Sequence, residues 1–481
     1  MAKKIKGSIN WTRAIWLYIL AFVCFSLLTI LPNILLDVQN ISYIKIIIQL
    51  LATIFLLFAL GAYIYFADKQ TLEESRKTFA TIVTMILSYC AIWLGARWEY
   101  GYNVVPFALC SLILSLIVSN RTGFFANFVV IMLYFMQELN WQQNASMATE
   151  YAFYILFSGL IEAVFTAFIL GGQYRRIRYI GIGFAIGLVS AVCSAMSYAM
   201  FVERVSWDWF EFGSRMGWSF ASGIASVMLM FMLVPILERV FNIVSVFRYS
   251  EIATSDTELM RQLFQKAPGT YNHSLTVANY AEACAVAIGQ SPIEARAAAY
   301  YHDIGKMKNP TYFAENQFSG TNPHDAMTPE ASVTMIKTHA TYGLALAKEH
   351  NLPPEVQSAI IEHHGTMPLK YFYLKAQKYT DGVLPYDGYC YEGPKPQNKI
   401  SAILMICDAC ESALRASSDV SMAEKIVDDI VWERLEFDQF SECDITMKEI
   451  DIIKTTILTT YLGIKHKRVK YPDVKMESDL K

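Results

Sequence analysis

The stretch YNHSLTVANYAEACAVAIGQSPIEARAAAYYHDIGK, residues 271–306, carries two superimposed patterns. Its apolar residues recur every three or four positions, which predicts helices rather than strands. Set into that pattern are His273 and the adjacent pair His302 and Asp303, which packing does not explain. Imidazole and carboxylate groups in this arrangement indicate a metal site that draws further ligands from downstream.

Candidate ligands follow at intervals along the second half of the chain. His339 occurs in KTHATYG, His363 and His364 in IIEHHGT, and Asp408 in ICDACES. Five imidazoles and two carboxylates without a thiolate favour Fe, Mn or Zn over copper(I). A single ion takes three or four protein ligands, so seven predict two ions, about 3.5–4 Å apart, that share a carboxylate.

Asp303 is the predicted bridge because it adjoins His302 at an expected helix end. His273, His302 and Asp408 would complete one metal site, and His339, His363 and His364 the other. Such a pair of ions favours phosphodiester hydrolysis, because it can share a hydroxide and contact the non-bridging phosphate oxygens. Lys306, one turn beyond His302, could neutralise phosphate charge. Asp303 and Lys306 are therefore the candidate catalytic residues.

Composition limits the alternatives. The net charge of −3 argues against a dominant nucleic-acid surface. Nine scattered cysteines give no secreted disulfide framework and favour a reduced compartment. Cys407 and Cys410 flank the Asp408 ligand as C-x-x-C, but no second such pair accompanies them. All eight histidines lie at or after position 273, so the chemistry is expected in the second half; His324, His350 and His466 are by default structural.

The first half is apolar enough to belong in lipid. Segments that could span a membrane are 14–36, 44–67, 79–96, 103–119, 122–138, 151–172, 177–200 and 217–237. The first follows a basic start and lacks a cleavage site, so residues 1–36 are predicted to be an uncleaved anchor. With the N-terminus inside, the start and the inner connectors carry eleven Lys and Arg against four outside, which predicts that both termini are cytoplasmic.

Two features inside these segments admit more than one interpretation. Glu162, near the middle of a span, could mark a ligand or proton site, or could make a helix-packing hydrogen bond. Gly183 and Gly187 have a spacing that lets helices approach closely, which favours bundle packing over a dimer seam. After the last span, charges at helical spacing predict a linker helix over 247–265 that ends before Pro268 and Gly269. A mostly helical domain over 266–475 and a tail over 476–481 complete the chain.

The order of the candidate ligands resembles that of HD-domain phosphohydrolases: NHS comes first, then HD, and later His, His-His and Asp. Longer sequence segments are more specific than the ligands alone. These segments are LVPILERVF, KAPGTYNHSLTVANYAEACA, ARAAAYYHDIGKMKNP, ENQ, NPHD, IIEHHGT and GPKPQ. They are similar to those of bacterial membrane proteins in which a seven-transmembrane region precedes a cytoplasmic HD domain that hydrolyses cyclic di-AMP. The resemblance covers roughly 44–475 and is strongest in the HD half.

That resemblance implies an all-α protein: a membrane bundle of about eight spans, of which 44–246 form the seven-transmembrane region, followed by the HD domain. It also implies a linear pApA product, a di-iron or di-manganese centre, and metal roles for the seven residues above. The expected setting is the bacterial inner membrane, with cyclic di-AMP and the lipid bilayer as partners, no nucleic-acid polymer, and a homodimer as a candidate assembly. The family's large extracytoplasmic domain is replaced here by a connector over 37–43, either by nature or by removal.

Substrate contacts are less well defined than metal ligands. A cyclic dinucleotide needs cations for its phosphates and aromatic faces for its bases. The candidates are Lys306, Tyr301, Asn322, His324, Tyr371 and Lys395. Cyclic di-GMP is an alternative substrate, although the HD subgroup that acts on it has an HHE…GYP motif where this chain has HHGTMPL. Another nucleotide, such as a guanosine alarmone, and a non-catalytic nucleotide-binding membrane receptor are further alternatives.

Overall fold

The computed structural model describes residues 11–36, 42–98, 101–141, 145–170, 176–202, 206–317, 322–379, 384–417 and 419–465. Regular structure within these ranges is helical, apart from an isolated β-bridge between Pro368 and Cys390. The expected all-α fold is therefore confirmed. The chain forms two compact units, Met1–Arg248 and Tyr249–Lys481. Most of the predicted connector and the whole predicted tail lie outside the described residues.

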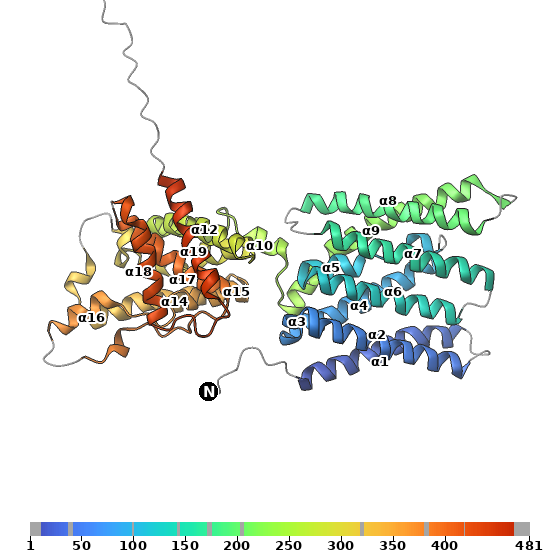
Figure 1. Ribbon diagram of the computed structural model, residues 1–481, viewed down its shortest axis with the longest axis horizontal. Coiled ribbons are helices and arrows are strands. Elements are labelled where there is room, and N and C mark those ends of the chain that lie inside the picture. The colour runs from blue at the N-terminus through green and yellow to red at the C-terminus, as the bar shows by residue number, and fades with distance from the viewer. Residues whose placement is uncertain are drawn as a thin grey trace, which may run out of the picture. The chain divides into compact units, whose positions relative to one another are not determined.

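The first unit is a bundle of long apolar helices that run side by side (Figure 1). They are α1 (Trp11–Leu36), α2 (Tyr43–Ala67), α4 (Ser75–Ala96), α6 (Asn120–Trp141), α7 (Ala145–Ile169), α8 (Arg176–Phe201) and α9 (Trp209–Phe241). Among the described residues, these seven are long and apolar enough to cross a membrane. The short elements α3 (Lys69–Glu73), η2 (Gly101–Val104) and α5 (Leu109–Ile117) connect them.

The expectation of a continuous span over 103–119 is wrong. This segment is broken into η2, an irregular stretch and α5, whose nine residues cover only about 14 Å. Gly101 has a φ of 58°, outside the helical region, and Pro106 disfavours helix at the residue before it. Eight of the nine α5 residues are buried, so the non-helical backbone before α5 adjoins protein rather than lipid.

The broken segment nevertheless runs from one end of the bundle to the other. At its start, the Asn103 side chain accepts hydrogen bonds from Ser194 of α8 and Ser219 of α9. Just beyond its end, Ser119 donates to Asp68, which caps the C-terminus of α2. Seven long helices and one broken segment therefore make eight passages through the bundle. As a result, the start of α1 and the end of α9 lie at the same end and line one groove.

Polar and small side chains organise the bundle interior. Glu162 of α7 is buried and accepts hydrogen bonds from Ser158 of its own helix, at 2.9 Å, and from Ser190 of α8. These contacts agree with the interpretation of Glu162 as a helix-packing residue. A Cβ on Gly187 would lie 2.4 Å from the Phe220 carbonyl oxygen of α9, so this glycine permits close packing of α8 against α9.

The linker predicted as one helix over 247–265 is instead two helices, α10 (Val246–Ile252) and α11 (Glu258–Lys266). The break falls in the sequence ATSDT, residues 253–257, whose Ser, Thr and Asp side chains compete for backbone hydrogen bonds. Thr257 caps α11 by accepting a hydrogen bond from the Met260 amide at 3.3 Å. The helix break therefore follows from local capping chemistry.

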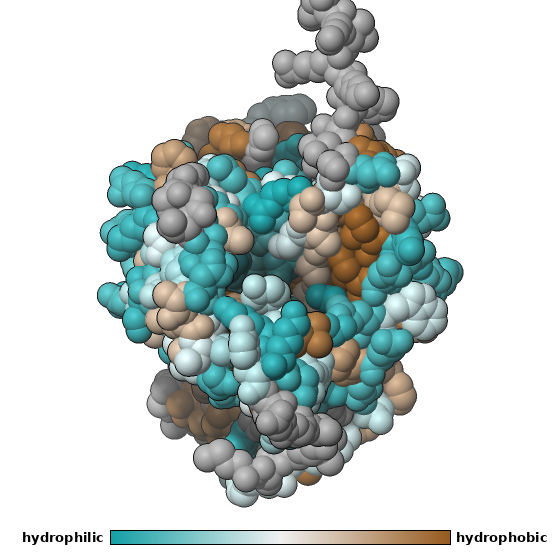
Figure 2. Space-filling model, turned by 90° about the vertical axis from the view of Figure 1, so that its left-hand side faces the viewer, coloured by the Kyte–Doolittle hydropathy of each residue, from teal (hydrophilic) through white to brown (hydrophobic). Residues whose placement is uncertain are grey.

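The second unit contains eight further helices, and one of them is largely buried. They are α12 (Pro268–Ala287), α13 (Pro292–Tyr301), α14 (Pro329–Glu349), α15 (Pro354–Glu362), α16 (Lys370–Gln377), α17 (Lys399–Ala416), α18 (Ala423–Glu436) and α19 (Met447–Lys465). Proline opens α12, α13, α14 and α15, where its missing N–H costs nothing. Most of α17 is buried, and α12, α13, α15 and α18 pack against it. Hydrophilic side chains cover most of the face of this unit that Figure 2 shows.

Candidate metal centre

Helix α12 places His273 in its second turn, and the start of that helix is closely packed. A Cβ on Gly269 would lie 1.9 Å from the Glu315 carbonyl oxygen in η6 (Ala314–Asn316). The Asn316 side chain accepts hydrogen bonds from the Gly269 and Thr270 amides at 2.9 and 3.2 Å. The bare glycine and the asparagine cap therefore hold η6 against α12, next to the candidate centre.

His302 and Asp303 lie where α13 ends and η4 (Ile304–Lys308) begins. Two residues on, a Cβ on Gly305 would lie 1.8 Å from the His339 carbonyl oxygen and 2.6 Å from the Gly343 amide, both in α14. The backbones of η4 and α14 are thus in direct contact. This contact brings Asp303 Oδ1 to 3.5 Å from His339 Nε2.

His363 caps the C-terminus of α15, and His364 follows it in a turn that Gly365 makes with a φ of 51°. Asp408 lies on the buried helix α17. The seven predicted ligands thus come from α12, the α13–η4 junction, α14, the end of α15, and α17. Residues that are 135 positions apart in the sequence meet here, as the 2.9 Å distance between His273 Nε2 and Asp408 Oδ1 shows.

The seven side chains form two groups that share one residue. One group contains His273, His302, Asp303 and Asp408; the other contains Asp303, His339, His363 and His364. In each group, one ligand atom per residue lies within 4.8 Å of the others. The structure thus brings together all seven residues in the division that the sequence predicted, with Asp303 common to both groups.

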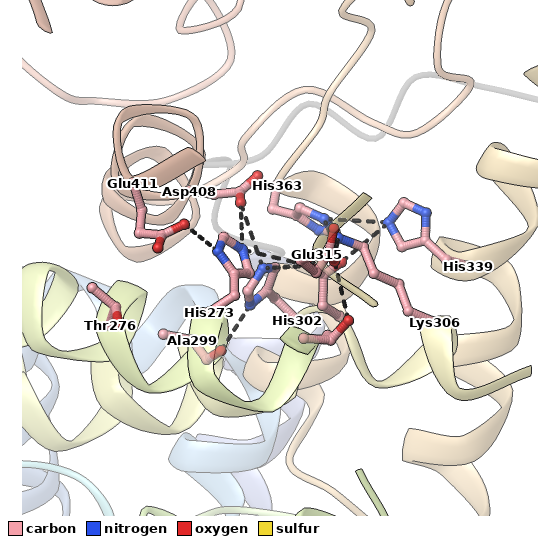
Figure 3. A network of polar contacts seen from close by, with 12 residues as sticks. His273, Thr276, Ala299, His302, Lys306, Glu315, His339, His363, Asp408 and Glu411 are labelled. Atoms are coloured by element: carbon pink, nitrogen blue, oxygen red, sulfur yellow. Dashed lines mark hydrogen bonds and ion pairs between the residues drawn. The ribbon is translucent and has the colours of Figure 1, made fainter. Parts of the chain in front are cut away.

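Backbone hydrogen bonds orient the imidazoles toward this centre. The Nδ1 atoms of His302, His339 and His363 lie 2.7, 2.7 and 2.9 Å from the carbonyl oxygens three residues earlier. When Nδ1 donates to these carbonyls, the Nε2 lone pair is available to a metal ion. Figure 3 shows His273, His302, His339 and His363 converging on one region.

Two buried atoms at the centre, His302 Nε2 and Asp303 Oδ1, make no hydrogen bond with a described residue. Their near neighbours are other predicted ligand atoms: Asp303 Oδ2 lies 3.1 Å from His302 Nε2, and His339 Nε2 lies 3.5 Å from Asp303 Oδ1. Buried polar groups normally have partners, so each such exception calls for an explanation. Metal ions would supply the missing partners, and the residues present therefore fit a metal centre.

Electrostatics differ between the two groups. Burial alone would raise the pKa of Asp303, but the charges of His302 and Lys306 hold that pKa well below its usual range. Burial alone would lower the pKa of His302, yet the neighbouring carboxylates raise it to about 10. Burial, together with the charge of His302, lowers the pKa of His363 to about 3. In the group with two carboxylates, His302 therefore favours its protonated form, whereas His363 of the other group remains neutral at physiological pH.

Lys306 is positioned by acidic residues. Its Nζ lies 2.7 Å from Asp303 Oδ2 and 2.8 Å from Glu315 Oε1. Burial would lower the pKa of Lys306, but these two carboxylates raise it above its ordinary value. The ammonium group is therefore held against the carboxylate that the two ligand groups share.

The other predicted substrate contacts lie outside both ligand groups. Tyr301 is buried, and its hydroxyl donates to the Ile252 carbonyl at 2.8 Å. The Lys395 ammonium lies 2.8 Å from Asp438, and His324 Nε2 lies 2.9 Å from the Tyr312 carbonyl. Asn322 caps η7 (Pro323–Ala326), whereas Tyr371 is 63% exposed on α16. For these five residues, a substrate role stays a prediction.

Three residues near the ligands were not predicted from the sequence. Glu411 contacts His273 Nδ1, and Glu315 pairs with Lys306. Glu411 could have been found, because it lies three positions after Asp408 on one helix and so shares its face. The Tyr391 ring stacks on His364 with centroids 4.2 Å apart, and it lies in a segment without helical periodicity that gave no signal.

Comparison with known proteins agrees with this geometry. Residues 270–413 match the family model described as HD domain, and HD domains are metal-dependent hydrolases. The helical second unit and its clustered His and Asp residues thus define an HD-domain protein. Residues 43–245 match the model described as 7TM receptor with intracellular HD hydrolase. The chain is therefore a membrane protein whose first half is similar to this seven-transmembrane HD family and whose second half matches the HD domain.

Two curated relatives match along most of the chain. The cyclic-di-AMP phosphodiesterase PgpH of Listeria monocytogenes serotype 1/2a (strain 10403S) is 34% identical over 428 residues, which is 87% of this chain and 58% of that protein. PgpH of Bacillus subtilis (strain 168) is 33% identical over 446 residues, 90% of this chain and 61% of that protein. The chain thus spans about three fifths of the length of these relatives.

A solved structure also matches the second half of the chain. The crystal structure of the L. monocytogenes PgpH HD domain in complex with cyclic-di-AMP is 44% identical. The match covers 44% of this chain and 99% of that one, with a TM-score of 0.43.

Proposed function

We propose that this chain is a membrane-bound HD phosphodiesterase that hydrolyses cyclic di-AMP to linear pApA and so controls the level of this second messenger. The observation that carries the proposal is the pair of ligand groups that share Asp303. The choice of substrate is supported by the relatives, which are named as cyclic-di-AMP phosphodiesterases. The cyclic di-GMP and receptor alternatives have no comparable support.

The ligand set fits two divalent ions. Imidazole and carboxylate ligands without thiolate suit Fe or Mn, and Asp303, common to both groups, would contribute to both sites. His273, His302, Asp303 and Asp408 would hold one ion, and Asp303, His339, His363 and His364 the other. When bound, the two ions would supply positive charge to the phosphate and lower the pKa of water that attacks it.

The chain's own residues would prepare this site in three ways. Backbone carbonyls and Glu411 hold the Nδ1 sides of the imidazoles, which fixes the direction of each ligand. Lys306 and Glu315 hold Asp303 in place as a carboxylate. Near-complete burial of His302 and Asp303 keeps bulk water away and strengthens the electrostatic interactions around the phosphate.

The reaction itself is a balanced hydrolysis. A water oxygen forms a bond to one phosphorus, the bond from that phosphorus to the ribose O3′ breaks, and a proton moves to O3′. One such event opens the ring and yields a linear dinucleotide. Lys306, 2.7 Å from Asp303, is the described cation nearest this carboxylate and is proposed to offset charge that develops on the phosphate.

The cellular setting is part of the same proposal. The excess of basic residues predicted on the inner connectors supports a bacterial inner-membrane protein with its HD domain in the cytoplasm. The shared location of the α1 start and the α9 end supports placing both termini on one side. The homodimer suggested by family resemblance stays a prediction.

The test is a product assay with each candidate nucleotide. The full chain, loaded with Mn or Fe, is incubated separately with cyclic di-AMP, cyclic di-GMP and a guanosine alarmone, and the products are separated by chromatography. Linear pApA from cyclic di-AMP is expected. Turnover of another nucleotide without pApA would overturn the substrate assignment, and binding without turnover would support the receptor alternative.

Asp303→Ala tests the shared carboxylate. This variant should lose both ions, or nearly all activity, because each ligand group contains Asp303. Asp451→Ala, on the exposed face of α19, is the matched control and should keep both. Retention of two ions per chain in Asp303→Ala, measured by elemental analysis, would contradict the bridging role.

A further inference from the structure

A groove opens in the membrane bundle between α1, α4 and α9, at the end where α9 terminates. Its volume of about 760 Å³ lies within the range of small-molecule sites. Most of its wall is apolar and comes from Trp16, Leu17, Leu20, Phe79, Val240 and Phe241. Trp16 is 66% exposed and Val240 is 67% exposed, so this wall faces the lipid that surrounds a membrane bundle.

The same groove is also cationic. Arg13 of α1 and Arg76 of α4 line it, and none of the described lining residues is acidic. The acidic residues just before Arg76 have other partners, since Glu73 lies 3.7 Å from Lys69 and Glu74 lies 3.0 Å from Lys77. Two guanidinium groups beside an apolar wall therefore form a basic, amphipathic site.

We propose that this groove binds an anionic phospholipid. The headgroup phosphate would lie against Arg13 and Arg76, and an acyl chain would cover the wall formed by residues such as Trp16 and Phe79. Basic pockets between transmembrane helices suit anionic headgroups, and tryptophan is favoured at the interface between lipid and water. The site is separate from the HD centre and does not depend on the proposed hydrolysis.

The chemistry of the groove argues against other occupants. A soluble phosphate would contact the arginines but would leave the apolar wall uncovered. The N-terminal sequence before the described residues, MAKKIKGSIN, contains three lysines and no acidic residue, so its charge does not complement Arg13 and Arg76. A second copy of the bundle would have to bring an anionic group to this position. An anionic lipid satisfies both parts of the site at once.

The bound lipid would also contact the end of α9. Arg76 Nη1 donates to the Asn242 carbonyl at 3.1 Å, and Asn242 caps α9 with a φ of 49°. The Phe79 and Phe241 rings meet edge to face with centroids 5.3 Å apart. A lipid at this position would therefore stabilise the last turn of α9, where the chain leaves the membrane bundle.

The experiment compares lipid binding by two double variants of the full chain. Arg13→Gln with Arg76→Gln removes the groove cations; Arg121→Gln with Arg178→Gln removes two cations at the starts of α6 and α8, which do not line the groove. Native mass spectrometry measures binding of phosphatidylglycerol, phosphatidylcholine or inorganic phosphate to detergent-solubilised protein. Two lost charges should weaken phosphatidylglycerol binding about thirtyfold in the groove variant.

Leu20→Trp provides a second variant that fills the groove without changing charge, in case the arginine variant fails to fold. It should also lose bound phosphatidylglycerol, whereas the Arg121 and Arg178 control should stay within about threefold of the parent chain. Equal losses in groove and control variants, or equal binding of phosphatidylcholine, would overturn the proposal. Displacement of the lipid by inorganic phosphate would also overturn the proposal. Dimers that form when no lipid is bound, through a second copy of the chain at the groove, would overturn it as well.

Discussion

Gly305→Ala should disable the metal centre, although Gly305 is not a ligand. The added Cβ would lie 1.8 Å from the His339 carbonyl oxygen, where ordinary contact begins at 3.4 Å. The gap between η4 and α14 must therefore open by about 1.6 Å, the difference between these values. Both neighbouring atoms belong to the backbone, so no flexible side chain can absorb the change.

The size of the effect follows from that displacement. If η4 moved as a rigid piece, the 3.5 Å separation of Asp303 Oδ1 and His339 Nε2 would grow to about 5 Å, too far for both to hold one ion. Misplacement of a catalytic group by 1 Å can cost about a hundredfold in rate. Overpacking of this kind costs about 1–3 kcal/mol of folding free energy.

Three measurements test the Gly305→Ala prediction: metal content, pApA production from cyclic di-AMP, and denaturant unfolding. The variant should hold fewer than two ions, lose at least about a hundredfold in kcat/KM, and unfold more easily. Gly463→Ala, on the exposed face of α19, should instead stabilise the fold by about 0.5–1 kcal/mol and keep full activity. Two bound ions and parental activity in Gly305→Ala would refute the packing argument.

Two further predictions concern the group with two carboxylates. Glu411→Gln weakens the contact that orients His273, so metal affinity there should fall about 10–100-fold in chelator competition; Glu424→Gln, exposed on α18, should change little. Because the pKa of His302 is raised to about 10, a metal ion must displace its proton below that pH. Because the pKa of His273 in the same group is also raised, affinity should rise by at least about tenfold per pH unit from pH 7 to 9, while the group with His363, whose pKa is about 3, should vary much less. Equal pH slopes in isothermal titration calorimetry would contradict this difference.

Hydropathy located the long helices of the membrane unit but not the break in one of them. The segment 103–119 is as apolar as its neighbours, so a composition window predicts a continuous span. Gly101 and Pro106 break the helix through backbone geometry and a missing N–H, which hydropathy does not measure. The break is tolerated because neighbouring helices bury it, and such burial is visible only in three dimensions.

At the candidate metal centre, the clustering of His and Asp side chains was predictable because their chemistry differs from that of their surroundings. Five imidazoles and two carboxylates interrupt helical patterns that would otherwise be explained by packing. Tyr391 was not predictable, since a tyrosine in an irregular segment is ordinary and only the fold brings it to His364. The contact of Gly305 with α14 was likewise hidden, because a glycine shows nothing in the sequence of what lies beside it.

The ligands of the centre depend on different levels of structure. His302, His339 and His363 are oriented by carbonyls of their own helical turns, so each keeps its direction as long as its helix forms. The Asp303 side chain depends on more distant contacts as well: η4 packs against α14, and Lys306, which holds Asp303, pairs in turn with Glu315 of η6. A substitution that frees one of these histidines from its carbonyl should therefore weaken binding of one ion. A substitution that shifts η4 or η6 should weaken binding of both ions together.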